Sequence, residues 1–213
     1  MTGTRQLCFC LAAVLVLITV GVASAQKTIP IAEDQVLYEM IGEFNNSGPA
    51  SLQYGYLSSV TGLASVFSGP TEDETTALFT FVTNATTFQV VNHGPFRIVD
   101  RTGTTTIYLN NGPSDFSNPA SFSQGTPIQV SSYRQQVIIN TLTNTFVTVH
   151  TNTVTDVERF ILNGTAYRLG QVGRSFRTNY TGQINTPGAV PSGWFAGTST
   201  GSKNLSACRL ARF

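Results

Sequence analysis

Apolar and polar residues alternate along the stretch from Thr126 to Gly170, and this period of two predicts β-strands joined by tight turns. One side of the first strand carries Tyr133, Gln135, Val137 and Ile139, and the other carries Arg134, Gln136 and Asn140. Further along, Val147 and Val149 alternate with Thr148 and His150. The pattern predicts a meandering antiparallel sheet and no particular chemistry.

Turn residues separate these strands at short intervals. Leu142-Thr143-Asn144 predicts one turn, and Asn163-Gly164 is the dipeptide best suited to a two-residue hairpin that needs positive φ twice. Asn45 to Pro49, Asn92-His93-Gly94 and Arg101-Thr102-Gly103 predict further connections.

The rest of the chain repeats this pattern. Residues 32–44 could form a short helix, but Val36, Tyr38 and Met40 also alternate, which favours a strand. Further strands are predicted at residues 52–57, 77–83, 87–91, 96–100, 104–109, 174–184 and 193–198.

The stretch Asn110–Gly125 is long, irregular and contains two prolines, which excludes a central strand. Connections of this length are uncommon and are often functional. We expect Phe116 and Phe122 to fix it to the body of the domain, where it could cover Tyr133, Arg134 and His150.

About ten short strands at this spacing predict an all-β fold, an antiparallel meander forming a barrel or roll, with a two-sheet sandwich as the alternative. Closure into a barrel is favoured because it removes exposed sheet edges. The succession resembles lipocalin-like and allene-oxide-cyclase-like barrels in architecture alone. No motif of either family is matched, so the resemblance implies no activity and no site residue.

The first 25 residues have the features of a cleavable secretory signal. An apolar run follows Arg5 and ends at Ala23-Ser24-Ala25, which predicts cleavage between Ala25 and Gln26. We therefore expect a single β-domain at residues 26–200, a flexible tail at 201–213, and a secreted, periplasmic or cell-surface location. After cleavage we expect no membrane association.

Composition and charge narrow the possible partners. Without Arg5 the twelve Lys and Arg fall to eleven, equal to the eleven Asp and Glu, so no basic field would attract nucleic acid. Removal of Cys8 and Cys10 leaves Cys208 alone, which excludes an internal disulfide. The sequence does not indicate an oligomeric state.

Reactive motifs are weak. The two histidines, His93 and His150, stand apart without a metal-binding partner in the sequence, so we predict no metal and no cofactor. The acidic residues lie beside predicted turns, where Asp100-Arg101 is most simply a local ion pair. No catalytic residue can be assigned.

A ligand site in a barrel would combine aromatic and polar side chains on one face. Aromatic residues on alternating strand positions are more often core, and Trp194 could plug a barrel end rather than stack on a sugar. The candidates are Tyr54, Tyr56, Arg97, Tyr133, Arg134, His150 and Trp194.

Three functions remain open. The first is a secreted, non-enzymatic domain that binds a small ligand or glycan or acts structurally at the cell surface. The second is a cofactor-free barrel isomerase, cyclase or hydrolase; a pocket with Arg134 or His150 beside Tyr133 and an acid would support it, and an interior of only Phe, Val and Leu would exclude it. The third is a small outer-membrane barrel.

Overall fold

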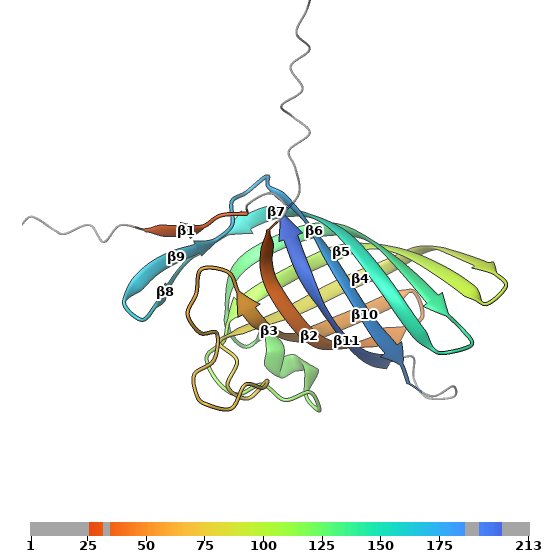
Figure 1. The fold of residues 1–213 in the computed structure, drawn as a ribbon, viewed down its shortest axis with the longest axis horizontal. Coiled ribbons are helices and arrows are strands. Elements are labelled where there is room, and N and C mark those ends of the chain that lie inside the picture. Colours follow the sequence, from red (N-terminus) through yellow and green to blue (C-terminus); the bar gives the residue numbers. More distant parts are fainter. Residues whose placement is uncertain (1–25, 32–34, 186–191, 202–213) are drawn as a thin grey trace, which may run out of the picture.

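A computed structural model of the protein describes residues 26–31, 35–185 and 192–201. Eight antiparallel strands close into a barrel in the order β10-β11-β2-β3-β4-β5-β6-β7, and a smaller sheet has the order β1-β9-β8 (Figure 1). The predicted all-β barrel is therefore confirmed, and the alternative sandwich is wrong. The barrel strands are β2 (Val36–Ser47), β3 (Ala50–Val60), β4 (Phe79–His93), β5 (Phe96–Leu109), β6 (Thr126–Asn140), β7 (Thr145–Val157), β10 (Ser175–Ile184) and β11 (Ser192–Gly201).

Alternating side chains determine which face of each strand is inside the barrel. Along β7, buried and exposed residues alternate from Thr145 to Val154, with Phe146, Thr148 and His150 inside. In β6, Tyr133, Gln135 and Val137, which were predicted to share one side of the strand, are all buried. An eight-stranded barrel leaves an interior that side chains can fill or that can hold one small ligand.

Several predicted turns are confirmed by their backbone geometry. Asn144 has φ 55°, and the Asn163-Gly164 hairpin has φ 50° and 77°. Gly94 joins β4 to β5 with φ 56°, as the Asn92-His93-Gly94 pattern predicts. In each case a residue that tolerates left-handed backbone occupies the position that requires it.

The predicted turn at Arg101-Thr102-Gly103 is wrong, because these residues lie in the middle of β5. Glycine is required here for close packing rather than for a turn. A Cβ on Gly103 would lie 2.8 Å from the Tyr133 hydroxyl oxygen and 2.1 Å from a carbonyl oxygen of β4. The four short strands predicted between residues 77 and 109 are therefore two long strands, β4 and β5.

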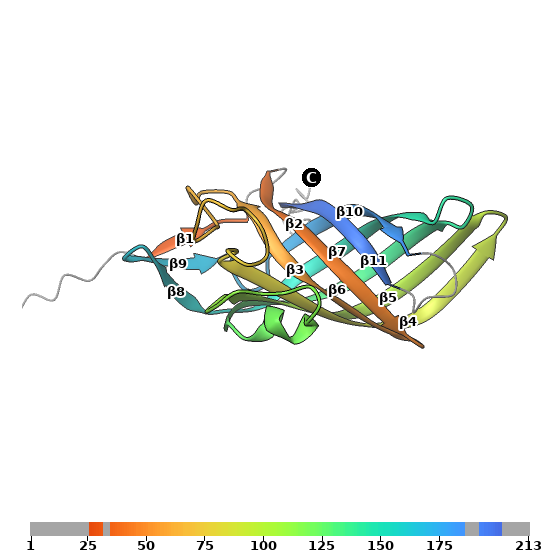
Figure 2. The ribbon, with the colours of Figure 1, turned by 90° about the horizontal axis from the view of Figure 1, so that it is seen from below.

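The small sheet packs at one end of the barrel. It consists of β1 (Lys27–Ile29), β8 (Arg159–Leu162) and β9 (Thr165–Leu169), and β1 runs parallel to β9. The Phe160 ring meets Phe79 edge-on, with centroids 5.6 Å apart. Figures 1 and 2 show β8 and β9 at the end opposite the long β4–β5 hairpin.

The 110–125 connection lies against the outside of the barrel, below β3 in Figure 2. It contains a short 3₁₀ helix at Pro119–Ser123. Phe122 is fully buried and its ring packs against that of Tyr54 on the outer face of the barrel. The Thr80 hydroxyl donates to the Phe122 carbonyl at 2.7 Å. The expected anchoring by Phe116 and Phe122 is confirmed, but the connection covers β3 and β4 instead of Tyr133, Arg134 and His150.

Some predictions concern segments outside the described residues. These are the signal sequence, the turn expected at Thr186-Pro187-Gly188, and the tail with Cys208. Within the described part of the chain, no helix is long and apolar enough to cross a membrane.

Candidate functional site

A cavity of about 450 Å³ lies inside the barrel. It reaches the end that carries the exposed β2–β3 turn at Gly48-Pro49, away from the small sheet. Its wall is mainly apolar, with Phe44, Val137, Ile139, Phe146 and Ile184 among the lining residues. The volume falls in the range of small-molecule binding sites, which are about 300–1,000 Å³.

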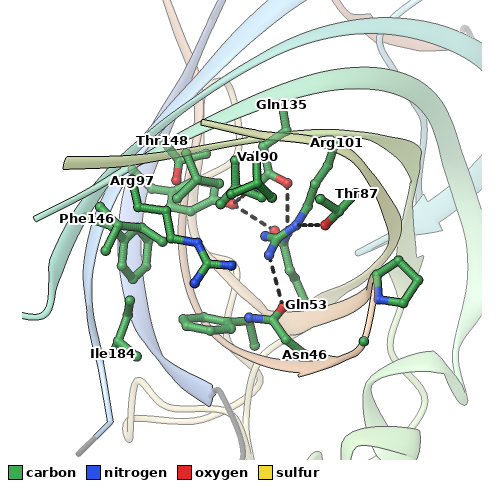
Figure 3. Close-up of a pocket in the computed structure, with 17 residues that line it drawn as sticks. Asn46, Gln53, Thr87, Val90, Arg97, Arg101, Gln135, Phe146, Thr148 and Ile184 are labelled. Atoms are coloured by element: carbon green, nitrogen blue, oxygen red, sulfur yellow. Dashed lines mark hydrogen bonds between the residues drawn. The ribbon is translucent and has the colours of Figure 1, made fainter. Parts of the chain in front are cut away.

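Three polar side chains form the floor of this cavity by bonding across the barrel, and Figure 3 labels two of them, Gln53 and Gln135. The Tyr180 hydroxyl donates to Gln53 Oε1 at 2.8 Å, and Gln53 Nε2 donates to Gln135 Oε1 at 3.3 Å. Gln135 Nε2 completes the ring by donating to the Tyr180 oxygen at 2.6 Å. Because the three residues come from β10, β3 and β6, this cross-barrel ring fixes distant strands relative to one another.

His150 lies below the cross-barrel ring and does not line the cavity. It borders a second, much smaller space, of about 20 Å³, which shares Gln53 and Tyr180 with the cavity above. Its Nε2 is 3.0 Å from the Tyr180 oxygen. Since the single phenolic proton of Tyr180 is donated to Gln53, His150 is the donor to that oxygen and is protonated at Nε2.

The environment of His150 keeps the imidazole neutral. Burial, and secondarily the positive charge of Arg101, lowers the pKa of His150 to about 3. The Tyr133 ring stacks on it with centroids 4.6 Å apart and planes 7° from parallel. The Tyr133 hydroxyl is buried and has no hydrogen-bond partner among the described residues, and burial raises its pKa. The pair is therefore packed as part of the barrel interior.

Arg97 and Arg101 both line the cavity from β5, separated by the inward-facing Val99. Arg101 donates from Nε to the Thr87 hydroxyl at 3.1 Å and from one terminal nitrogen to Asn46 Oδ1 at 3.4 Å. Burial lowers the pKa of Arg101, and the charge of Arg97 lowers it further.

An irregularity in β4 shapes the wall beside Arg101. The pairing of β4 with β5 shifts register between Thr87 and Gln89, as a β-bulge does. As a consequence, Thr87 and Val90 both line the cavity, although residues three positions apart normally face opposite sides of a strand. A strict alternation would have directed one of them outward.

The structure separates the seven sequence candidates into three groups. Arg97 lines the cavity, and Tyr133 and His150 lie together below the cross-barrel ring. Arg134 is exposed on the outer face, with its guanidinium carbon 5.3 Å from the centroid of Phe88. The remaining three are also outside the cavity: Tyr54, Tyr56 and Trp194.

The outer aromatic residues pack with the 110–125 connection. Trp194 is 53% exposed, so it does not plug the barrel end, and its ring centroid is 5.5 Å from that of Phe116. Tyr54 donates to Glu43 Oε2 at 3.2 Å and accepts from Asn45 Nδ2 at 3.0 Å. Burial and the neighbouring Glu43 charge raise the pKa of Tyr54 to about 12.

The sequence reasoning missed most of the cavity's polar residues. Arg101 was assigned to a turn, although Arg97, Val99 and Arg101 alternate as inward residues of a single strand. Tyr180 also alternates with buried Phe176 and Thr178 in β10, which was a usable signal. The pairing of Gln53 with Gln135 carries no local signal, because 82 positions separate them.

No group of three or more His, Cys, Asp or Glu side chains suited to a metal ion occurs within the described ranges. Comparison of the chain with protein-family models, with curated proteins and with solved structures gives no match.

Proposed function

We propose that the protein is a non-enzymatic binding domain for a small, mainly apolar molecule held in the barrel cavity. The observation that carries this proposal is the cavity of about 450 Å³ itself, with a largely apolar wall and a few polar groups at its floor and side. Such a combination provides burial for the body of a ligand and hydrogen bonds that orient it. Export to the cell surface or beyond, which the first 25 residues indicate, is part of the proposal.

The enzymatic alternative receives less support from the geometry. His150 stands beside Tyr133, as that hypothesis requires, but neither residue lines the cavity, and His150 borders only a space of about 20 Å³ below the cross-barrel ring. The acid that the hypothesis also requires is missing from the cavity lining among the described residues. A general acid or base must come within hydrogen-bond reach of the substrate.

The outer-membrane alternative is disfavoured by the outward positions of the barrel. Glu39 on β2, Arg134 on β6 and Arg177 on β10 are exposed there. Outward positions in a membrane barrel form an apolar band, and charges within it are destabilising. We therefore do not propose this function.

Binding can be tested with N-phenyl-1-naphthylamine, a neutral apolar probe whose fluorescence increases in apolar surroundings. The variant Ile139→Trp adds a large ring to the cavity wall and should abolish the fluorescence increase. Ile138→Trp is the matched control, because Ile138 is the adjacent residue on β6 and is exposed on the outer face.

We expect the probe to bind to the wild type and to Ile138→Trp, and to raise their melting temperatures by mass action. Ile139→Trp should fold, as shown by its circular dichroism spectrum, without binding the probe. Equal binding by both variants, or no binding by the wild type, would refute a ligand cavity at this position.

A further inference from the structure

Two guanidinium groups point into the same mainly apolar cavity. Arg97 and Arg101 are four residues apart on β5 and therefore project from the same face of the strand. Figure 3 shows both side chains directed into the space between the β5 wall and the wall that carries Phe146 and Ile184. This arrangement places two like charges on one wall of the cavity. Arg97 is exposed to solvent, whereas Arg101 is partly buried, and a desolvated charge is unfavourable without a counter-charge.

The protein does not supply that counter-charge from the cavity lining. Among the described residues that line the cavity there is no Asp and no Glu. The hydrogen bonds of Arg101 go to two neutral oxygens, on Thr87 and Asn46. The groups that shift its pKa are Tyr180, Tyr133 and Arg97, and none of them is a carboxylate.

Arg101 also has donors left for a ligand. A guanidinium carries five N–H groups in a planar fork, and the bonds to Thr87 and Asn46 use two of them. These two bonds hold the fork in place, which reduces the conformational entropy that ligand binding would cost. A carboxylate or sulfonate matches the geometry of such a fork.

We propose that the cavity binds an amphipathic anion, whose acidic head group pairs with Arg101 and Arg97 and whose apolar body contacts Phe44, Ile139, Phe146 and Ile184. This inference rests on the proposed function, because it assigns a ligand class to the same cavity. It distinguishes fatty-acid-like or arylalkyl carboxylates from neutral alcohols, esters and glycans of similar size.

The test compares ligands that share one apolar body and differ in the head group. Decanoate, 1-decanol and decyltrimethylammonium are each used to displace N-phenyl-1-naphthylamine at pH 8, where decanoate is ionised. A charge-assisted pair with Arg101 should make decanoate displace the probe at a concentration about tenfold lower than 1-decanol. The cationic ligand should be the weakest of the three.

Arg101→Gln should weaken the binding of decanoate much more than that of 1-decanol, so that the ratio of the two affinities falls close to one. Arg97→Gln is a second variant, at an exposed position, so the test remains decisive if Arg101→Gln does not fold. Arg97→Gln should lower the ratio of decanoate affinity to 1-decanol affinity by less than Arg101→Gln does. Arg134→Gln is the matched control, because Arg134 lies on the outer face. It should leave the ratio unchanged.

Each outcome is informative. Equal affinity for decanoate and 1-decanol in the wild type, or a preference that survives both cavity variants, would overturn the anion inference while the proposed binding function stands. If neither ligand displaces the probe, or if the probe does not bind, the proposed function itself fails.

Discussion

For two of the buried tyrosines of the barrel, Tyr180 and Tyr133, the same substitution should have opposite effects on stability. The Tyr180 hydroxyl contacts Gln53, Gln135 and His150 at 2.8, 2.6 and 3.0 Å. The Tyr133 hydroxyl is equally buried and has no hydrogen-bond partner among the described residues. Replacing each tyrosine by phenylalanine removes one oxygen and leaves the ring, so the two variants differ only in what the oxygen bonded to.

The loss in Tyr180→Phe can be worked out from the partners left behind. A buried polar group deprived of its partner costs about 1–3 kcal/mol. Gln53 and Gln135 line the cavity, so water entering it can replace part of their loss, whereas His150 lies below the cross-barrel ring. We expect the free energy of unfolding to fall by about 3 kcal/mol, or by roughly 6–12 °C in melting temperature for a domain of this size.

Tyr133→Phe should instead raise the free energy of unfolding. It removes an oxygen that is desolvated without compensation and retains the stack on His150. We expect a gain of about 1 kcal/mol and a melting temperature higher by roughly 2–4 °C.

Urea unfolding followed by circular dichroism, with thermal melts of the same samples, measures both changes at pH 7.5. A melting temperature of Tyr180→Phe within 2 °C of the wild type would correspond to a loss of less than about 0.5–1 kcal/mol in the free energy of unfolding. That result would show that the cross-barrel ring contributes little to stability. A loss in Tyr133→Phe as large as that in Tyr180→Phe would show that the Tyr133 hydroxyl is bonded in the folded protein.

Two further predictions concern pH and the outer connection. His150 is neutral in the folded state down to pH about 3, whereas unfolded histidine takes up a proton below about 6.5, so stability should fall with decreasing pH in that window by up to about 1.4 kcal/mol per unit. Urea unfolding at several pH values should show this loss of stability in the wild type and not in His150→Gln. Equal slopes of the free energy of unfolding against pH in the two proteins would refute it. Phe122→Ala should cost about 3–5 kcal/mol because Phe122 is fully buried, whereas Phe88→Ala, at a side chain 51% exposed, should stay within about 0.5 kcal/mol. Thermal melts of the two variants compare these costs, and similar melting temperatures would show that the 110–125 connection is not anchored through Phe122.

The sequence by itself determined the local features of this fold. Alternation assigned Gln135 and Val137 to one face of β6 and Arg134 to the other, and Asn163-Gly164 located a hairpin by its backbone preference. These predictions succeeded because side-chain direction in a strand and left-handed turns depend on residues within a few positions of one another.

Tertiary structure alone decided where the cavity lies and which residues meet in it. Barrel closure brings Gln53 beside Tyr180 across 127 positions, and the register shift after Thr87 changes which residues of β4 face inward. Gly103 illustrates the limit of local patterns: its position beside Arg101 predicted a turn, but the approach of Tyr133 from another strand requires the glycine in the middle of β5. Contacts between distant strands carry no signal in the local sequence, because they depend on the shear and closure of the whole barrel.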